Sequence, residues 1–312
     1  MKLLVLGAGA TGGYFGGRLA QAGADVTFLV RERRAAQLAA DGLVVKSPHG
    51  DFTVRARYVK QSEVRPEYDL VLLTCKAYDL DSALESIRPA LGPAAHLLPL
   101  LNGLAHLDRL DAELGAPRVL GGTCHIAGTM TPAGEIRQLT PLHRIAYGLR
   151  PGTSPDARAK LAALHSAYQR TSIDAVLADD IMLELWEKYI LLTTLATMTC
   201  LMRASVGDIM ATGEGEALME ETLQACVRTA AAAGHVPREK ALAGARKFLF
   251  ERGSAFTASM LRDMESGQRT EGDHIVGDML RRARAAGVDP GPLRAAYAHL
   301  QAYQVRRKRE GG

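Results

Sequence analysis

The stretch with the clearest chemical potential is the amino-terminal loop Gly7, Ala8, Gly9, Ala10, Thr11 and Gly12. Its G-x-G-x-x-G spacing follows the short apolar run Lys2–Leu6, which predicts a buried strand, and precedes a helical pattern. This order is typical of dinucleotide-binding sites, because the amino terminus of the helix attracts the pyrophosphate. Gly7 would make the tight turn, Gly9 would let the backbone approach the pyrophosphate, and Gly12 would let the helix pack on the strand. A plain glycine-rich turn is the alternative, but the strand-and-helix context favours a nucleotide.

The residue after the second predicted strand, Asp25–Val30, indicates which dinucleotide binds. An acidic residue there accepts hydrogen bonds from the ribose of NAD, whereas an arginine accommodates the 2′-phosphate of NADP. Here the strand is followed by Arg31, with Arg33 and Arg34 close behind. Because a guanidinium matches the geometry of a phosphate, the sequence favours NADP(H). Glu32 could point into solvent or could soften this preference.

Two further polar residues follow predicted buried strands. Lys76 ends the run Tyr68–Lys76, and Asn102 with Gly103 follows the run His96–Leu101. In an open parallel sheet ligands bind beyond the carboxyl ends of the strands, so these residues and the glycine loop are expected along one rim. Taken separately, Lys76 could be a solvated lysine and Asn102-Gly103 a simple turn. Their shared place on the rim favours a role in binding.

Polar residues of the second half pose a similar choice. Lys188 lies among bulky apolar residues in the stretch Leu185–Tyr189 of a long predicted helix. Such a lysine could simply extend its ammonium to solvent, or it could serve as an acid. Thr270 and Glu271 fit a helix amino terminus, with Thr270 as the cap and Glu271 favoured by the dipole. That interpretation leaves a role for Glu271 in a site open.

The elements that must position these residues change character along the chain. Strand and helix patterns alternate in the first half, which predicts an α/β domain with a mostly parallel, doubly wound sheet. Residues 43–54 predict a small hairpin, and residues 118–149 read as several short strands that extend the sheet. The period is 3.6 from Asp179 onward, so we expect domains 1–170 and 171–312, the second all-helical. Its later predicted helices are Gly215–Ala233, Arg238–Phe250, Ala255–Ser266, Gly272–Ala286 and Gly291–Gln304.

The composition is that of an ordinary globular protein. With 312 residues, 47% hydrophobic and 23% charged, the chain is long enough for two domains. A net charge of +4 is too small to argue for a nucleic-acid partner, and the basic run Arg306–Arg309 reads as a solvated tail. The four cysteines are widely spaced, which predicts free thiols in a reducing compartment and no metal site. The sequence shows neither a signal peptide nor a membrane-length apolar run, so we expect a cytoplasmic protein without a membrane partner.

Taken together, these motifs resemble the ketopantoate reductases (2-dehydropantoate 2-reductases), NADPH-dependent enzymes of pantothenate biosynthesis. The resemblance covers essentially the whole chain and implies an N-terminal Rossmann domain with an all-α C-terminal domain. By position, it implies Lys188 as the general acid, Glu271 as support for Lys188 or the substrate, and Asn102 and Ser259 as substrate ligands. It places Lys76 near the substrate and cofactor anions, and it assigns Asn102 and Glu271 to the cofactor site as well. The motifs that carry it are Gly7–Gly12, Arg31, Cys75-Lys76-Ala77-Tyr78, Leu101-Asn102-Gly103, Trp186-Glu187-Lys188, Ser259-Met260-Leu261-Arg262-Asp263 and Thr270-Glu271-Gly272-Asp273.

The chemistry explains these residue types. Hydride addition to a 2-keto carbon leaves an alkoxide, which needs a proton and a nearby positive charge, and an ammonium supplies both. A carboxylate such as Glu271 would keep Lys188 protonated. Proton donation of this kind contributes on the order of 10² to 10⁴ in rate.

The chain departs from the family pattern after the lysine. The best-known members carry asparagines one and two turns later that bind substrate hydroxyls, whereas this sequence has Leu192 and Ala196. Thr193, Thr194 and Thr197 are close by but offset in angle. Buried hydroxyls without partners cost about 1–3 kcal/mol each, enough to change the substrate preference. We therefore expect reduction of a 2-keto acid, with either ketopantoate or a less hydroxylated acid as the substrate.

Two other functions stay open. The chain could be another dehydrogenase class with an acid–base lysine, acting on hydroxy acids or amino acids. It could also be a non-catalytic NADP(H)-binding regulator, which would keep the glycine loop and Arg31 but tolerate loss of Lys188. The expected partner is a small-molecule 2-keto acid, with a homodimer open and strict preference for NADPH over NADH undecided.

Overall fold

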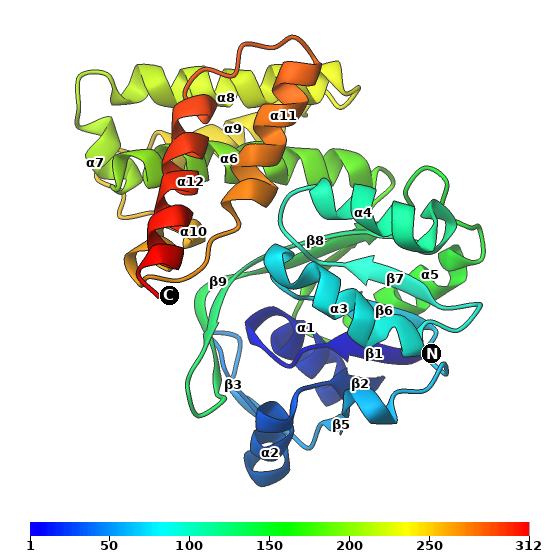
Figure 1. Cartoon of the computed structure of the whole chain (residues 1–312). Coiled ribbons are helices and arrows are strands. Elements are labelled where there is room, and N and C mark those ends of the chain that lie inside the picture. Colours follow the sequence, from blue (N-terminus) through cyan, green and yellow to red (C-terminus); the bar gives the residue numbers. More distant parts are fainter. Residues whose placement is uncertain (312) are drawn as a thin grey trace. The chain divides into compact units, whose positions relative to one another are not determined.

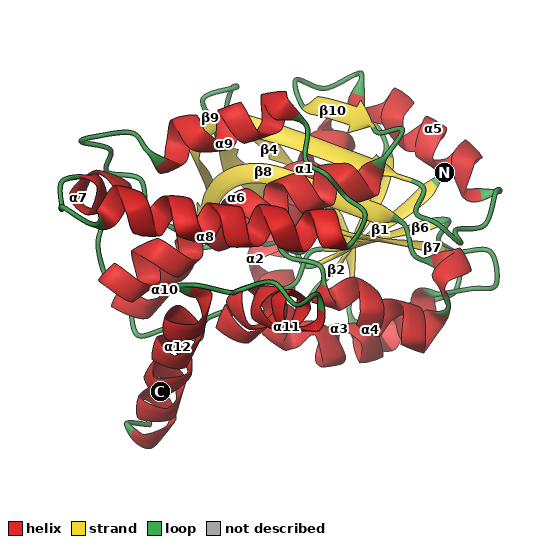
Figure 2. Ribbon diagram, turned by 90° about the horizontal axis from the view of Figure 1, so that it is seen from above, coloured by secondary structure: helices red, strands yellow, loops and turns green. Residues whose placement is uncertain are grey.

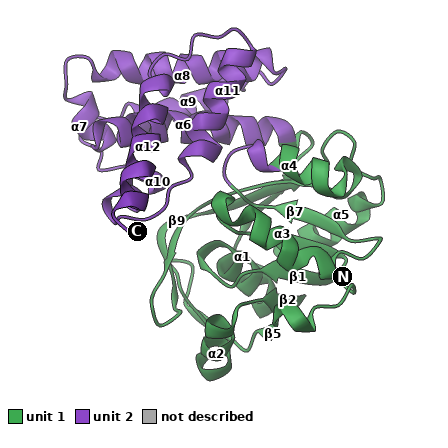
Figure 3. Ribbon diagram, in the orientation of Figure 1, with its two compact units in different colours: residues 1–101, 107–181 green, residues 102–106, 182–312 purple. Residues whose placement is uncertain are grey.

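The computed structural model describes residues 1–311 and divides into two compact units (Figure 3). Unit 1 comprises residues 1–101 and 107–181, and unit 2 comprises residues 102–106 together with the chain from Met182 onward. This division falls later than the boundary we expected near residue 170, because strand β10 (Asp174–Leu177) pairs with β9 of unit 1. Each unit is described by itself below.

The first sheet of unit 1 is fully parallel. Its strands are ordered β5-β2-β1-β6-β7, so β1 is central with β2 on one side and β6 on the other (Figure 1). The order reverses at β1, which is where open parallel sheets bind ligands. The residues of β6 are all buried, as their uninterrupted apolar sequence predicts. The strands are β1 (Lys2–Leu6), β2 (Asp25–Leu29), β5 (Arg57–Val59), β6 (Leu70–Leu73) and β7 (His96–Pro99).

The second sheet corrects one expectation. Residues 118–149 do not extend the first sheet as short strands; they form two long antiparallel strands of a second sheet, ordered β10-β9-β3-β4 with β8 on β9. Glycines suggested breaks in this stretch, but Gly122 packs closely on β7 and Gly128 adjoins a β-bulge, so both lie inside a strand. The hairpin expected in residues 43–54 is confirmed. The remaining strands are β3 (Leu43–Lys46), β4 (Phe52–Val54), β8 (Gly121–Met130) and β9 (Ile136–Gly148).

Helix α1 (Ala10–Gln21) lies between the two sheets. A Cβ on Gly16 would press on Phe28 of the first sheet, at 3.0 Å, and one on Gly17 would press on Leu43 of the second, at 2.9 Å. The small residues of α1 therefore let both sheets approach one helix. The buried cluster around it combines side chains of both sheets and stabilises unit 1 as a single core.

The other helices of unit 1 connect its strands. The chain of this unit also makes four short 3₁₀ turns: η1 (Gln61–Glu63), η2 (Ala77–Asp79), η3 (Arg88–Ala90) and η4 (Ala116–Arg118). The helices are α2 (Glu32–Asp41), α3 (Leu80–Ile87), α4 (Ala105–Leu114), which begins in the 102–106 segment, and α5 (Ala157–Tyr168).

The regular secondary structure in the described residues of unit 2 consists of helices joined by loops (Figure 2). The helix expected over Gly272–Ala286 is divided into a π-helical turn, η5 (Asp273–Gly277), and α11 (Asp278–Ala285). A π-turn is a local widening that often accompanies a functional site. The basic run Arg306–Arg309 is the last turn of α12 rather than a tail. The helices are α6 (Ile181–Met202), α7 (Val206–Met210), α8 (Gly215–Ala232), α9 (Glu239–Leu249), α10 (Ser259–Glu265) and α12 (Leu293–Arg309).

The α/β unit followed by a helical unit confirms the fold class expected from the sequence. None of the helices within residues 1–311 combines the length and the hydropathy needed to span a bilayer. None of the four cysteines, which all lie within residues 1–311, forms a disulfide; three are buried and Cys75 is half-buried.

Candidate functional site

The loop between β1 and α1 requires glycine at two positions. Gly7 has a φ of +87°, in the left-handed region, and its N–H donates to the carbonyl oxygen of Leu29 at 2.9 Å. A Cβ on Gly12 would overlap with the carbonyl oxygen of Gly7 and the hydroxyl of Thr74. A Cβ on Gly9, in contrast, would meet no atom within 4 Å. The loop is therefore packed on its inner side and open beside Gly9.

The amino terminus of α1 fits an anion. Its N-cap residue, Gly9, has no side chain to cap the helix, and its first turn contains no acidic residue. The free N–H groups and the positive end of the helix dipole are therefore available at the open side of the loop. These residues fit the pyrophosphate of a dinucleotide, as the sequence motif predicts.

Arg31 and Glu32 differ in how they are engaged. Arg31 is the exposed N-cap residue of α2, just beyond β2, and no hydrogen bond or ion pair joins its side chain to another residue in the described range 1–311. Glu32 pairs with Lys60 at 3.1 Å. The carboxylate of Glu32, which could have bound a ribose, is thus paired with Lys60 near β5. The guanidinium of Arg31, at the end of β2, is exposed to a ligand.

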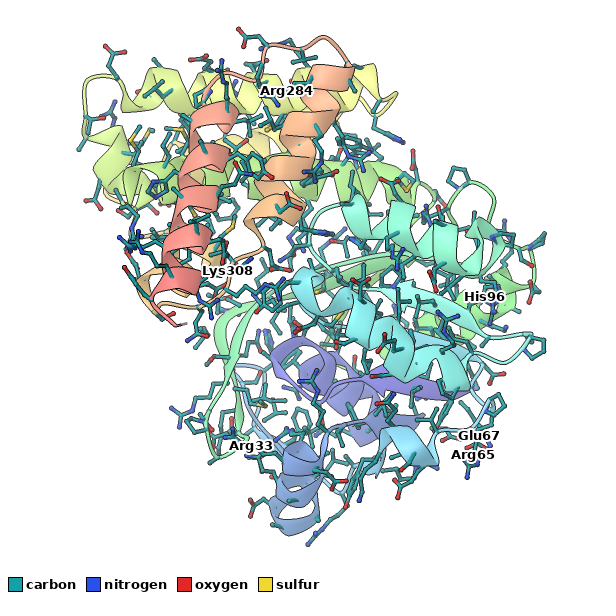
Figure 4. All side chains as sticks on the ribbon, viewed as in Figure 1. Arg33, Arg65, Glu67, His96, Arg284 and Lys308 are labelled. Carbon is teal, nitrogen blue, oxygen red and sulfur yellow. The ribbon has the colours of Figure 1, made fainter. Side chains whose placement is uncertain are left out.

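Arg33 and Arg34 hold other parts of unit 1 in place. The Nε of Arg34 donates to the carbonyl oxygen of Ala8 in the glycine loop at 2.9 Å, and its Nη1 donates to that of Gly134 at 2.7 Å. Arg33 donates to the carbonyl oxygen of Pro132 at 3.1 Å (Figure 4). Burial lowers the pKa of Arg34. Both residues therefore have structural partners, unlike Arg31, whose side chain makes no hydrogen bond or ion pair within residues 1–311.

Lys76 lies at the rim where the sequence placed it. It is exposed and follows β6, the neighbour of β1, and the hydroxyl of Thr74 just before it donates to the carbonyl oxygen of Leu6 at 2.7 Å. Lys76 and the glycine loop thus share the carboxyl edge of the first sheet. Asn102, expected on the same rim, belongs to unit 2.

Within unit 2 the structure brings Lys188 and Asn102 together. The Nζ of Lys188, in the middle of α6, donates to Oδ1 of Asn102 at 2.9 Å, and both side chains are half-buried. Buried neighbours on α6, Trp186 and Tyr189, fix the helix on either side of the lysine. An ammonium has three N–H donors, and Asn102 accepts one of those of Lys188.

Glu271 is buried in the segment that precedes η5. Its backbone carbonyl accepts from the N–H of Ile275 at 3.0 Å, an α-helical bond that joins Glu271 to the start of η5. The expectation that Thr270 caps this helix is wrong. The N-cap residue is Gly272, and the hydroxyl of Thr270 accepts from Nε2 of Gln304 on α12 instead. A buried carboxylate is stable only with compensating partners, which makes Glu271 a credible member of a polar site.

Ser259 is the first residue of α10 and is half-buried. The preceding residue, Ala258, donates its N–H to the hydroxyl of Thr199 on α6 at 3.4 Å, so the start of α10 lies against α6. Thr199 is three turns beyond Lys188, roughly 16 Å along the helix axis. The role of Ser259 as a substrate ligand stays a prediction.

The side chains that follow Lys188 along its own face of α6 are apolar. Leu192 is half-buried and Ala196 is fully buried. The hydroxyl of Thr194 donates to the carbonyl oxygen of Ile190 at 2.9 Å, within the helix. The hydroxyls of Thr193 and Thr197 are buried and have no hydrogen-bond partner in the described part of the chain. The threonines therefore lie on other faces of α6 and do not replace the missing asparagines.

Sequence reasoning missed two histidines of unit 2. His106 and His274 stack with ring centroids 5.5 Å apart, and Nδ1 of His106 lies 3.3 Å from Nε2 of His274. Their spacing from the predicted site residues could have indicated them, since His106 follows Asn102 by four residues and His274 follows Glu271 by three.

Two family models together cover most of the chain. One, described as Ketopantoate reductase PanE/ApbA, matches residues 3–152, and the other, Ketopantoate reductase PanE/ApbA C terminal, matches residues 180–304. The chain belongs to the ketopantoate reductase family. Membership identifies it as an oxidoreductase of that family.

Individual relatives agree with this family. The chain is 34% identical over 306 residues to the uncharacterized oxidoreductase YkpB of Bacillus subtilis (strain 168), covering 98% of this chain and 99% of that protein. The crystal structure of 2-dehydropantoate 2-reductase from Methylococcus capsulatus matches with a TM-score of 0.86 at 26% identity, covering 98% of both chains. The ternary structure of D-mandelate dehydrogenase with NADH and anilino(oxo)acetate shares the fold, with a TM-score of 0.84 at 20% identity over 99% of both chains.

Proposed function

We propose that this ketopantoate reductase family member reduces a 2-keto acid with NADPH, and that Lys188 is the general acid. The observation that carries the proposal is the 2.9 Å hydrogen bond from Lys188 to Asn102, which fixes an ammonium beside a carboxamide in unit 2. When bound, a reduced nicotinamide supplies the hydride that adds to the keto carbon. Unit 1 would hold the nucleotide, and unit 2 would contribute the acid.

The proposed roles of Lys188, Asn102 and Glu271 follow from the charges and hydrogen-bonding groups of their side chains. Lys188 gives one N–H to Asn102, and an ammonium held in this way can approach the keto oxygen and protonate the alkoxide that forms there. Asn102 holds the ammonium in one orientation, and a fixed orientation is worth several kcal/mol of barrier. Glu271, buried in the same unit, would favour the charged form of Lys188.

The preference for NADPH is supported by the end of β2. Arg31 is exposed at the position that selects between ribose and 2′-phosphate, and Glu32 is paired with Lys60. An arginine there favours a phosphate, and the glutamate has a cationic partner already. Lys76 on the same edge of the sheet would add a second positive charge.

The substrate that we propose is a branched 2-keto acid with few hydroxyl groups. Leu192 and Ala196 lie one and two turns after Lys188 and offer no hydrogen bonds to a hydroxylated chain. Ketopantoate, the substrate that the family name indicates, carries a hydroxyl that this apolar face would leave unpaired.

The test is NADPH oxidation with ketopantoate and with a panel of plain branched 2-keto acids, for the wild type and for Lys188→Ala. We expect turnover by the wild type and loss of at least about a hundredfold in the variant, with nucleotide binding retained. NADPH binding without turnover of any 2-keto acid would overturn the proposed reaction and indicate a regulator.

A further inference from the structure

Two histidines of unit 2, His106 and His274, are close in sequence to Asn102 and Glu271 respectively. His106 is fully buried in the first turn of α4, four residues after Asn102. His274 belongs to the π-turn η5, which begins just after Glu271. The two rings are nearly parallel, at 26°, and their facing nitrogens are 3.3 Å apart. The pair therefore joins the segment that carries Asn102 to the segment that carries Glu271.

His274 also contacts the Asn102 turn itself. The backbone of Asn102 is close enough to the imidazole to raise the pKa of His274, against the larger effect of burial. Gly103, with a φ of +77°, lies so close that a Cβ there would be 3.2 Å from Cδ2 of His274 and 3.3 Å from its carbonyl oxygen. The turn is thus packed against His274 and has no room to shift toward it.

The other side of η5 is fastened to the helix that carries the lysine. The hydroxyl of Tyr189, the residue after Lys188, lies 2.8 Å from the carbonyl oxygen of Ile275 and 3.0 Å from Oδ2 of Asp278. Asp278 in turn accepts from Arg282 at 2.8 Å. The π-turn is therefore fixed between α6 on one side and the Asn102 turn on the other.

We propose that His274 is a positioning residue, which holds the Asn102–Gly103 turn so that the carboxamide of Asn102 meets the ammonium of Lys188. This inference rests on the proposed function, in which that ammonium donates the proton. His274 does not itself reach the reacting atoms in this account; it acts through Asn102.

Burial, rather than the charges around it, keeps the ring of His274 neutral. Burial lowers the pKa of His274, and this effect outweighs the nearby carboxylates of Glu271, Asp278 and Asp273, which raise it. Asp273 is engaged by Arg281 at 3.2 Å and Asp278 by Arg282, so neither carboxylate is uncompensated. The other neighbours of the turn are His106 on α4 and Tyr189 and Lys188 on α6. A neutral imidazole has one donor and one acceptor, which lets it pair with the ring of His106 without a charge.

The test compares His274→Phe, which keeps a ring and loses the hydrogen bonds, with His274→Gln, which keeps a neutral donor. In NADPH-dependent reduction of the best 2-keto acid, we expect His274→Phe to lower kcat at least about tenfold with KM changed less than about threefold. His274→Gln should recover most of that loss. The matched control is His299→Phe on α12, a half-buried histidine of the same unit, which should leave kcat within about twofold.

A double-mutant cycle separates positioning from a general structural role. If His274 acts through the carboxamide, His274→Phe should have almost no further effect on kcat in an Asn102→Ala background. Equal losses of kcat in both backgrounds would overturn the inference, as would a kcat of His274→Phe within twofold of the wild type. Should His274→Phe fail to fold, His106→Phe takes its place in the same cycle, with the same two outcomes.

A crystal structure of each variant gives a readout that does not need turnover. In His274→Phe the distance from Nζ of Lys188 to Oδ1 of Asn102, 2.9 Å in the wild type, should exceed hydrogen-bond length, and in His274→Gln it should not. An unchanged distance in His274→Phe overturns the inference whatever the activity. Absence of turnover by the wild type would instead overturn the proposed function, and the distance would still decide the role of His274.

Discussion

The guanidinium of Arg34 donates to the backbone carbonyl of Ala8 at 2.9 Å, which fastens the start of α2 to the glycine loop between β1 and α1. The same side chain reaches the carbonyl oxygen of Gly134 at 2.7 Å, in the turn between β8 and β9. One half-buried arginine therefore joins three segments that are far apart in the sequence. Arg34 therefore helps to fix the conformation of the glycine loop that is expected to bind a pyrophosphate.

We predict that Arg34→Met, which keeps the apolar stem, weakens NADPH binding about tenfold and lowers the melting temperature, because buried carbonyls lose charged partners. Isothermal titration with NADPH and thermal unfolding measure both effects. Arg33→Met is the control, since its bond to Pro132 is exposed and should matter little. Equal effects of the two substitutions would contradict a special role for Arg34.

For Arg31, we expect the effect to depend on the cofactor. Arg31→Ala should raise the Kd of NADPH by about tenfold or more and change the Kd of NADH by less than about threefold, since only NADPH carries the 2′-phosphate. Glu32→Gln should leave both constants nearly unchanged, because Glu32 is paired with Lys60. A parallel loss of affinity for both nucleotides in Arg31→Ala would show that this arginine does not read the phosphate.

At Lys188 the proposed chemistry predicts a loss of kcat without a loss of nucleotide binding. Lys188→Ala should lower kcat at least about a hundredfold, and Asn102→Ala should lower it by less, because the ammonium remains in the second variant. Steady-state kinetics and NADPH titration together separate these quantities. If Lys188→Ala kept a tenth of the wild-type kcat, the lysine would not be the general acid.

The substrate preference should follow Leu192. Leu192→Asn places an amide one turn after Lys188, where it could pair with a substrate hydroxyl, and such a pair is worth about 1–3 kcal/mol. We therefore expect kcat/KM for ketopantoate, relative to a plain branched 2-keto acid, to rise at least about fivefold in this variant. A clear preference of the wild type for ketopantoate would reject the apolar-pocket explanation.

The stability of unit 1 should fall in acid because of His143. Its Nδ1 lies 2.8 Å from the hydroxyl of Tyr14, and its ring stacks on that of His49 with centroids 3.5 Å apart. Burial, with His49 and Arg18 adding to it, lowers the pKa of His143 from 6.5 to about 4. The unfolded chain therefore binds this proton first as the pH falls. Stability present above pH 6.5 is lost down to about pH 4, by up to about 3 kcal/mol.

Urea unfolding at a series of pH values from 7.5 to about 4.5 measures this loss. His143→Gln removes the titrating group, so its unfolding free energy should vary less with pH than that of the wild type. An identical pH profile for both proteins would assign the acid sensitivity to other groups.

Much of unit 1 could be predicted because its strands are buried on both faces. Runs such as Leu70–Leu73 contain no polar residue, and Gly7–Gly12 has a fixed order of strand, loop and helix around it. Strand β5 was missed because Arg57–Val59 is short and lies at the sheet edge, where the pattern is weak. The long hairpin of β8 and β9 was read as fragments because glycine signals a break unless its packing partners are known.

The candidate site was predictable in its residue types and less so in its contacts. Lys188 and Asn102 were both named from the sequence, but their hydrogen bond joins positions 86 residues apart, which no local pattern reports. The pairing of Glu32 with Lys60 is likewise a tertiary contact that the sequence does not report. His274 was overlooked because a histidine in an amphipathic stretch carries no signal of its own until the turn it supports is known.

The position of α1 between two sheets limits how this protein can be engineered. Its glycines leave no clearance for larger side chains toward Phe28 on one side or Leu43 on the other. A larger side chain at Gly16 or Gly17, introduced to change the affinity for a nucleotide, would clash with one of the two sheets and destabilise unit 1. Redesign of cofactor choice therefore has to begin at the exposed ends of the strands, above all at Arg31, where a side chain can be exchanged without disturbing the interior.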